Sequence, residues 1–148
     1  MSMDIHVCWR GAFAPSRAAL QGALKEVGFE ATVLHDFPGD GGFWPIDIGE
    51  FKTGVEADAD DDLDELVEDY PVLAAALDGR DRGVTFTFGG DPAEAGTALA
   101  LAAAIAHLCG AVVYEPSEGV TFSTSRAVAE ARDSFEMAKK EGYRQRED

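Results

Sequence analysis

The most restrictive feature of this sequence is a stretch, residues 95–108, in which almost every side chain is small or apolar. Asp91, Pro92 and Glu94 occupy the capping, first-turn and third positions that typically begin a helix, and Gly110 suits the position that ends one. A surface helix would show a polar side, and this stretch shows very little polar surface. We therefore expect a helix that other elements cover on several sides.

Two segments of the chain share one plan, a strand followed by a helix and a second strand. In the first, Ile5, Val7 and Trp9 alternate with more polar residues, and a helix then runs from Pro15 to Gly28. The second segment contains the apolar helix. The complete set of other predicted elements is strands at residues 29–37, 44–48, 51–55, 84–88, 111–114 and 120–122, a short helix at 71–77 and a final helix at 126–141.

This order of elements predicts an α+β fold in which two strand-helix-strand units form a ferredoxin-like sandwich. A hairpin and an acidic helix are inserted between the units, and an extra helix follows at the C-terminal end. The 148 residues match the size of one domain, and no linker rich in Pro, Gly and Ser divides them. We expect residues 1–148 to form a single α+β domain with an insertion at approximately 38–83.

Acidic residues are concentrated in one run. Residues 56–69 contain nine acidic side chains and no basic one, which is more than half of the formal net charge of −16. The apolar positions of the run, Leu63, Leu66, Val67 and Tyr70, recur at helical spacing. We predict one amphipathic helix whose carboxylates face water. Such a surface attracts basic partners and repels nucleic acid and anionic membrane, so neither is expected as a partner.

The local character of this charge bears on its origin. An adaptation to high salt would also make the last helix acidic, and residues 126–148 contain six basic and six acidic side chains. The chain has only four lysines, however, so a halophilic source remains an alternative explanation.

The acidic run partly matches a calcium-binding EF-hand loop. Four aspartates fall at loop positions 1, 3, 5 and 7, namely Asp58, Asp60, Asp62 and Asp64. Leu63 then occupies the position where the loop needs glycine, and Asp69 occupies the position of the bidentate glutamate. We expect no metal here and interpret the run as a solvated helix face or a docking surface.

Histidine and cysteine offer few combinations for metal binding or catalysis. His6 and Cys8 share one face of the first strand, and His35 lies near them if the second strand pairs with the first. No spacing motif supplies the remaining zinc ligands. A nucleophilic site would have to combine Cys8 with His6, His35 or His107, and no orienting third group is evident. We expect no catalytic residue and no cofactor, and we expect Cys8 and Cys109 to be buried free thiols.

Two segments before helices resemble phosphate-binding turns. In residues 88–92, Asp91 already occupies the cap that an anion would use, and the glycine-rich phosphate motifs are absent. In residues 123–125, a helix cap is the simpler interpretation of the segment Ser123-Thr-Ser125. We expect capping roles for both segments.

The loop before the predicted hairpin combines glycines with two adjacent aromatic residues, Phe43 and Trp44. We expect at least one of them to anchor the hairpin on the core. The other is a candidate for an exposed aromatic contact beside the acidic helix, because interfaces commonly place aromatic side chains among charged ones.

The sequence shows no secretory signal at its start, and the apolar stretch at residues 98–108 is shorter than the ~20 residues that span a bilayer. We expect a cytoplasmic protein.

Residues 98–116 form an alanine-rich helix that ends in Gly110, followed by a strand that closes with Glu115 and Pro116. This segment resembles small bacterial proteins, some of which are similar to immunity proteins of polymorphic toxin systems. The resemblance is confined to the second half of the chain and implies no particular functional residue. It adds an immunity protein to the functions that a binding protein of this charge suggests.

Three hypotheses follow. The first is a non-enzymatic binding module, an immunity or inhibitor protein that occludes a basic surface of a toxin or another enzyme. Its partner-binding residues would be Asp60, Asp61, Asp62, Asp64, Glu65, Glu68, Asp69, Phe43 and Trp44. The second is a small-ligand-binding or enzymatic domain with a pocket between sheet and helices. The third is a structural homodimer.

Overall fold

The structure, a computed structural model, describes residues 2–11, 15–38 and 41–146. Within these residues the strands are β1 (Met3–Trp9), β2 (Ala31–Val33), β3 (Gly42–Ile48), β4 (Phe51–Asp60), β5 (Arg82–Phe88), β6 (Val112–Glu115) and β7 (Val120–Phe122). The helices are α1 (Arg17–Glu26), α2 (Asp64–Asp69), α3 (Pro71–Leu77), α4 (Pro92–Cys109) and α5 (Thr124–Glu141).

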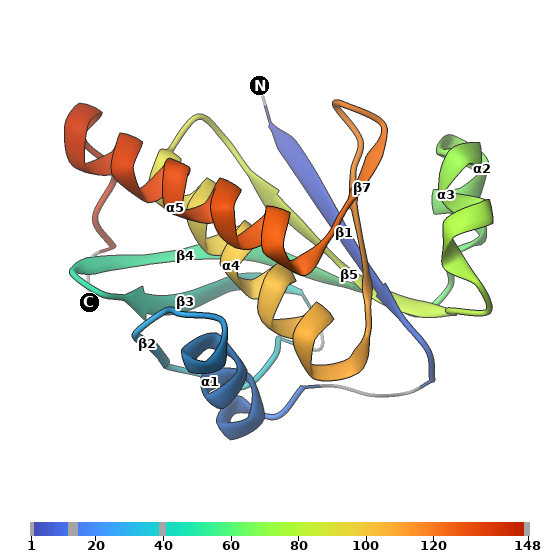
Figure 1. Ribbon diagram of the computed structural model, residues 1–148, viewed down its shortest axis with the longest axis horizontal. Coiled ribbons are helices and arrows are strands. Elements are labelled where there is room, and N and C mark those ends of the chain that lie inside the picture. Colours follow the sequence, from blue (N-terminus) through green and yellow to red (C-terminus); the bar gives the residue numbers. More distant parts are fainter. Residues whose placement is uncertain (1, 12–14, 39–40, 147–148) are drawn as a thin grey trace.

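The seven strands form one open antiparallel sheet in the order β2-β3-β4-β5-β1-β6-β7. Helices α1, α4 and α5 lie together over one face of this sheet (Figure 1). The short helices α2 and α3 lie apart from them, at the end of the molecule away from the C-terminus. The predicted α+β class is confirmed.

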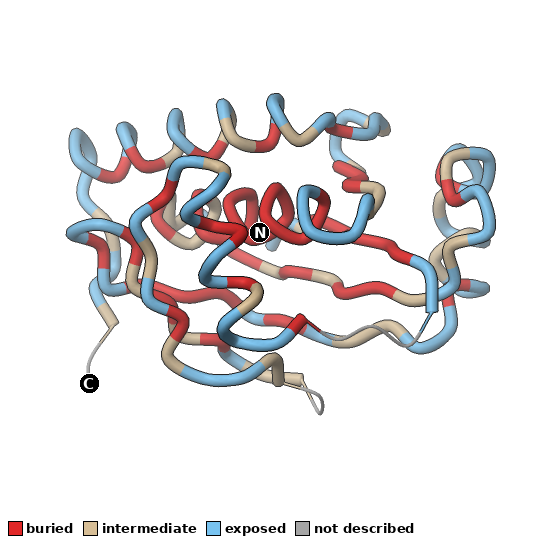
Figure 2. Tube along the Cα trace, turned by 60° about the horizontal axis from the view of Figure 1, so that its bottom comes forward, coloured by how far each residue is buried: buried red, intermediate tan, exposed pale blue. Residues whose placement is uncertain are grey.

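Helix α4 is the central helix, as its apolar sequence predicts. It packs between α5 and the sheet, and it is the most deeply buried helix in Figure 2. The Asp91 side chain accepts hydrogen bonds from the N–H groups of Ala93 and Glu94, and Gly110 ends the helix in the left-handed conformation. By length and composition alone α4 is apolar enough to cross a membrane, but 67% of it is buried inside the fold, as expected of a core helix.

A glycine sets how closely α5 approaches α4. A Cβ atom at Gly96 would lie 2.9 Å from the aromatic ring of Phe135 in α5, which is closer than carbon atoms pack. Phe135 also stacks on Phe51 of β4, with ring centroids 5.1 Å apart. The missing side chain at Gly96 therefore lets an α5 aromatic ring reach the sheet past α4.

The two faces of β1 serve two different clusters. Ile5, Val7 and Trp9 point toward α4 and belong to the main core. Cys8 points to the opposite face, where it packs with Tyr114, Leu63, Leu73 and Leu77 in a second, smaller cluster. The strand thus alternates as its sequence indicates, and both of its faces are covered at this end of the sheet.

The second cluster explains why α2 and α3 sit where they do. Each is a short helix, and isolated helices of this length are not stable in water. Their apolar residues Leu63, Leu66, Val67 and Tyr70, which the sequence places at helical spacing, pack against the sheet around Cys8. This covering is local and leaves the β4 side of the same sheet face without a helix over it.

The prediction of a single acidic helix over residues 56–69 is wrong. Residues 56–60 belong to β4, residues 61–63 connect, and only Asp64–Asp69 are helical as α2. Alternation explains the difference, because Ala57 is fully buried under the helices while Glu56 and Asp58 are exposed on the opposite face. Pairing of Glu56 to Asp60 with β5 stabilises the extended form.

The first predicted strand-helix-strand unit also differs. The expected strand at residues 29–37 is reduced to β2, which lies at the sheet edge beside β3 rather than beside β1. The hairpin that was expected as an insertion supplies β4, which pairs with β5 inside the sheet. His35 follows β2 and is therefore far from His6 across the sheet order.

The chain after α5 runs back along β4. The N–H of Arg146 donates to the carbonyl of Lys52 at 2.9 Å, and its guanidinium donates to the Thr53 carbonyl and to Asp47 Oδ1, each at 2.7 Å. Tyr143 packs edge-on against Phe51. These contacts hold the tail beside the part of β4 that β5 does not reach.

Candidate functional site

The candidate surface lies on the sheet face opposite α1, α4 and α5, which we call the open face. Strand register brings polar side chains from separate strands into rows there. Glu56 lies opposite Phe43 on β3 and opposite Thr87 on β5, and Thr87 lies opposite Asp4 on β1. Side chains directly opposite each other in antiparallel strands point to the same face.

Eight carboxylates continue from this face into α2, and we call them the acidic strip. All eight are exposed: Glu56, Asp58, Asp61, Asp62, Asp64, Glu65, Glu68 and Asp69. Among the described residues, no Lys or Arg forms an ion pair with any of them. Within the part of the chain that the structure describes, ion pairs with basic residues therefore do not neutralise the negative charge of the strip.

Helix α2 places two of its four carboxylates in favourable positions. Asp64 and Glu65 occupy the first turn, where the positive end of the helix dipole stabilises carboxylates. The Asp62 side chain accepts a hydrogen bond from the Asp64 N–H at 2.9 Å. Glu68 and Asp69 lie at the opposite end of α2, where the dipole opposes them. Of the α2 carboxylates, Glu68 and Asp69 are therefore the least stabilised by the protein's own structure.

Asp60 differs from the other predicted partner-binding carboxylates. Its Oδ2 accepts a hydrogen bond from the Thr85 hydroxyl at 2.7 Å. Burial raises the pKa of the Asp60 carboxyl above its ordinary value, against the lowering effects of Thr85 and His6. Asp60 is therefore part of an internal hydrogen-bond chain, and we exclude it from the acidic strip.

That chain continues from Thr85 to His6. Nδ1 of His6 lies 2.8 Å from the Thr85 oxygen. Since the single hydroxyl proton of Thr85 is donated to Asp60, the Thr85 oxygen accepts from His6 Nδ1–H, which leaves Nε2 unprotonated in the neutral ring. Burial lowers the pKa of His6, although Asp4 and Asp60 act to raise it, so the neutral form is favoured.

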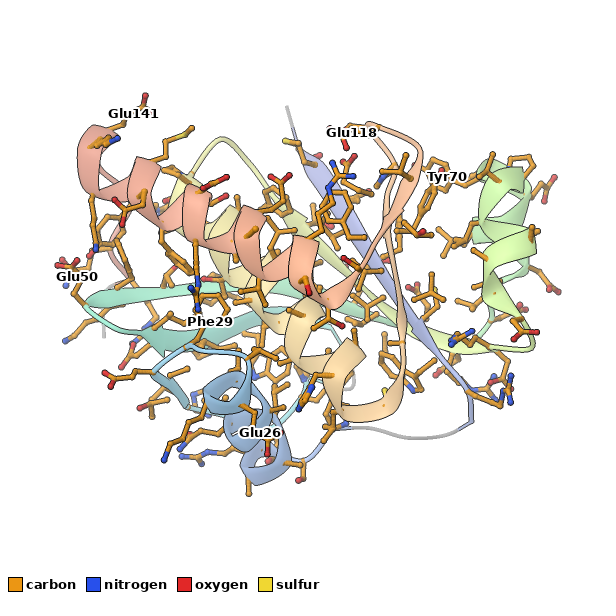
Figure 3. The ribbon with its side chains drawn as sticks, in the orientation of Figure 1. Glu26, Phe29, Glu50, Tyr70, Glu118 and Glu141 are labelled. Atoms are coloured by element: carbon orange, nitrogen blue, oxygen red, sulfur yellow. The ribbon has the colours of Figure 1, made fainter. Side chains whose placement is uncertain are left out.

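Two tyrosine rings enclose His6 on the remaining sides. The rings of Tyr70 and Tyr114 have centroids 5.6 Å and 6.4 Å from the His6 ring. Figure 3 shows Tyr70 between the strands and the α2–α3 pair. Nε2 of His6 is buried and has no hydrogen-bond partner among the described residues. It is thus shut off from solvent, which a general base acting on a dissolved substrate must contact.

The remaining residues considered for catalysis are dispersed. Burial raises the pKa of the Cys8 thiol to about 12, so Cys8 is not a nucleophilic thiolate at neutral pH. His107 is exposed at the end of α4, where its Nε2 lies 2.6 Å from Oε2 of Glu26 in α1. Its partner is therefore on α1 and not on β1, which carries Cys8 and His6. The described residues contain no group of three or more His, Cys, Asp or Glu side chains placed to hold a metal ion.

The two adjacent aromatics separate as the alternation of β3 requires. Trp44 is 1% exposed, stacks on Phe86 and meets Phe37 edge to face. Its Nε1 donates to the His35 carbonyl at 3.0 Å. Phe43 is 43% exposed on the open face. Trp44 is therefore core, and its predicted partner-binding role is wrong, while Phe43 retains the exposure that such a role needs.

Phe43 is held in place by a glycine. A Cβ atom at Gly54 of β4 would lie 2.5 Å from Cζ of the Phe43 ring, so the ring can cover the β4 backbone only because Gly54 has no side chain. Phe43 also lies directly opposite Glu56. An apolar group is thus fixed at one end of the acidic strip.

A pocket of 570 Å³ opens beside Phe43, where β5 ends and the tail takes its place next to β4. Its lining residues come from β3, β4, α4 and the tail, and they are Phe43, Thr53, Glu56, Glu94, Arg144, Gln145 and Arg146. Sequence reasoning missed this site because the expected elements end at Glu141 and no local motif indicates that the tail returns to β4.

Comparisons of this chain with protein-family models, curated proteins and solved structures give no match.

Proposed function

We propose that this chain is a non-enzymatic binding module whose acidic strip docks on a basic surface of a partner protein. One observation carries the proposal: eight exposed carboxylates follow one another along β4 and α2 with no ion pair to a described Lys or Arg. An unneutralised field of one sign speeds the encounter with an oppositely charged partner and sets its orientation.

The shape of the strip indicates what the partner presents. At roughly 3.3 Å per strand residue, the β4 segment from Glu56 to the end of the strand spans about 13 Å, and α2 extends it further. A partner would therefore need several basic side chains distributed along a ridge or cleft rather than one isolated cation. A nuclease or other enzyme with a basic substrate cleft fits this description, and occluding the cleft would inhibit it.

Phe43 supplies the apolar part of the proposed interface. It is exposed at the strip end and is fixed by Gly54, so little conformational entropy is lost when a partner covers it. Aromatic side chains that pack at an interface beside charged residues commonly dominate its binding energy. The proposed contact set thus keeps Phe43 and omits Trp44 and Asp60, which are engaged within the fold.

Charge reversal tests the proposal. The triple variant Asp61→Lys, Asp64→Lys and Glu68→Lys changes the strip, and a matched triple, Glu30→Lys, Asp133→Lys and Glu141→Lys, changes net charge equally at exposed positions elsewhere. Association rates would be measured at low and physiological salt with the partner purified from the native host. We expect the strip variant to associate about tenfold or more slowly at low salt and the matched variant about as fast as the parent.

The two triple variants separate a specific role of the strip from a general effect of net charge. Equal slowing in both would mean that total charge alone governs the encounter. An unchanged rate in the strip variant would remove the strip from binding. Circular dichroism of each variant confirms that the fold is retained, since all six positions are exposed.

We also propose that the central strands follow a ferredoxin-like plan. The order β6-β1-β5-β4 supports it, with α1 following β1 and α4 joining β5 to β6 across the same face. Strands β2, β3 and β7 and helix α5 would then be additions at the sheet edges and over α4. An experimental structure would test the assignment through the pairing of β1 with both β5 and β6.

A further inference from the structure

The pocket beside Phe43 contains charged groups of both signs. Glu56 of β4 and Glu94 of α4 line it, and so does Arg144 of the tail. Among the described residues, none of these three side chains forms an ion pair. Arg144 acts on Glu94 electrostatically, since it lowers the pKa of that carboxyl, but no direct ion pair between described residues keeps these charges from a ligand.

Thr53 provides a second, independent feature of a binding site. It lines the same pocket, is only 2% exposed, and its hydroxyl has no hydrogen-bond partner among the described residues. A buried polar group left without a partner costs about 1–3 kcal/mol. A polar group that entered the pocket and reached this hydroxyl would remove that cost.

Hydrogen bonds hold the residues that line the pocket in place. The Arg146 guanidinium bonds to Asp47 and to the Thr53 carbonyl, and the Arg144 N–H donates to Asp91 Oδ2 at 2.7 Å. On the opposite side the Phe43 ring rests on Gly54 and contributes an apolar surface. The site therefore exists before a ligand arrives, which reduces the entropy lost on binding.

We propose that this pocket binds a zwitterion, a free amino acid or a short peptide with an apolar side chain. The ligand ammonium lies toward Glu56 and Glu94, its carboxylate toward Arg144, and one of its polar groups bonds to the Thr53 hydroxyl. The Phe43 ring packs on the apolar side chain. The proposal concerns a small ligand and does not depend on the protein partner proposed above.

The mixture of charges excludes simpler ligands. A plain cation would be repelled by Arg144, and a plain anion would be repelled by two carboxylates. Burial and the neighbouring Asp91 and Glu56 raise the pKa of Glu94, while Arg144 acts to lower it, and an incoming ammonium would lower it further. At 570 Å³ the pocket lies within the usual range for small-molecule sites.

Calorimetric titration of the full chain tests the ligand class. The probes are L-phenylalanine and glycyl-L-phenylalanine, which are zwitterions, with N-acetyl-L-phenylalanine and L-phenylalaninamide as matched compounds that each lack one charge. We expect at least one zwitterion to bind with a dissociation constant near or below about 1 mM, and both single-charge compounds to bind about tenfold more weakly. Comparing the two zwitterions distinguishes a free amino acid from a peptide.

Three variants place the binding in this pocket: Thr53→Val, Glu94→Gln and Arg144→Met. Lys140→Met is the matched control, because Lys140 is exposed on α5 and lines none of this pocket. We expect each pocket variant to weaken binding about tenfold and the control to bind within about twofold of the parent.

The proposal is overturned if neither zwitterion binds at about 10 mM, or if the pocket variants bind as the control does. Thermal unfolding of Thr53→Val is measured in parallel, because this residue is buried. Glu94→Gln and Arg144→Met change partly buried or exposed residues and keep the test valid if Thr53→Val does not fold. Phe43 and Glu56 belong to both proposed sites, but none of the three pocket variants changes the acidic strip. We therefore expect these variants to keep the parent's association rates with a protein partner, so the two proposals fail separately.

Discussion

Thr85 donates its hydroxyl proton to Asp60 across 2.7 Å, and this bond determines which ring nitrogen of the neighbouring His6 carries a proton. Because the Thr85 oxygen then accepts from His6 Nδ1, the three residues form one polarised chain across β4, β5 and β1. Such a chain links three neighbouring strands through side chains as well as through the backbone ladder. Its members depend on one another, since among the described residues Asp60 Oδ2 and His6 Nδ1 have no hydrogen-bond partner other than Thr85.

Replacement of Thr85 by valine tests this dependence. Thr85→Val leaves the Asp60 carboxylate and His6 Nδ1 without a partner, so we expect the free energy of unfolding to fall by about 1–3 kcal/mol. Thr87→Val is the matched control, because Thr87 lies on the same face of β5 and, among the described residues, its hydroxyl has a single partner, Asp4 Oδ1. Urea denaturation of both variants should show the larger loss for Thr85→Val. Equal losses would contradict an interdependent chain.

The same chain predicts how stability depends on pH. Burial lowers the pKa of His6 below its ordinary value of 6.5, so as pH falls below 6.5 the unfolded chain takes up a proton before the folded chain does. The stability that neutral His6 contributes above pH 6.5 is therefore lost as pH falls toward the folded pKa. Asp60 acts in the opposite sense at lower pH, because its pKa is raised above 3.8 and the folded chain binds the proton first.

His6→Phe isolates the histidine contribution. The variant keeps a ring between Tyr70 and Tyr114 but cannot be protonated, so its stability should fall less than that of the parent between pH 7.5 and 5.5. Urea denaturation at each pH gives the difference, in which the titration of other carboxylates largely cancels. Parallel pH profiles for the parent and His6→Phe would show that His6 has the same pKa in both states.

The sequence already contained the signal that was misinterpreted in the acidic run. From Val55 to Asp60, small or apolar residues alternate with acidic ones, and residues 55–58 are alternately buried and exposed, as in a strand. The acidic composition is continuous across this alternation and the helical spacing of Leu63 to Tyr70. Composition alone therefore favours one helix over the whole run. At the end of β4 the acidic composition continues, but the spacing of the apolar residues changes from that of a strand to that of a helix. This spacing is the stronger indicator of secondary structure.

Other features depended on pairing that no local pattern reveals. The helices α1, α4 and α5 were predicted closely, because α1 and α5 have periodic apolar faces and α4 lies between the cap Asp91 and Gly110. Ser16 and Ser123 prove to be the caps of α1 and α5. By contrast, the pairing of β4 with β5 and the return of the tail to β4 join residues far apart in the sequence. The pocket depends on both contacts, so its lining could not be assembled from local signals.

Gly54 offers a test of how Phe43 is positioned. A Cβ atom there would lie 2.5 Å from the Phe43 ring and 2.5 Å from the Trp44 carbonyl oxygen, and the second contact is with paired backbone that cannot easily move. We expect Gly54→Ala to lower the free energy of unfolding by about 1–3 kcal/mol and to displace the ring. Gly22→Ala in α1 is the control, because nothing lies within 4 Å and alanine should stabilise that helix by roughly 0.5–1 kcal/mol.

Measuring Phe43 itself completes the Gly54 test. Nuclear magnetic resonance would follow the Phe43 ring protons, whose shifts should change in Gly54→Ala and stay constant in Gly22→Ala. If Gly54→Ala were as stable as the parent with unchanged Phe43 shifts, the ring would not depend on the missing side chain.

The two cysteines should react very differently with thiol reagents. Cys8 is fully buried beneath α2 and α3, and burial raises its pKa to about 12. Cys109 was also expected to be buried, but it is exposed, because it occupies the last position of α4, beyond the part of the helix that the sheet and α5 cover. The Cys109 thiol donates to the Ile105 carbonyl at 3.2 Å, and partial burial of this thiol raises its pKa. The Cys109 thiol is therefore accessible to reagents but reacts slowly.

Titration with an aromatic disulfide reagent at pH 8 should label one thiol in the folded protein and the second only in denaturant. Labelling of Cys109 should accelerate as pH rises, because the thiolate is the reacting species and the pKa of this thiol is raised. The variant Cys109→Ser should show no labelling until it unfolds, and its labelling rate would then report opening of the α2–α3 cluster over Cys8. Rapid labelling of both thiols in the folded parent would mean that this cluster does not cover β1.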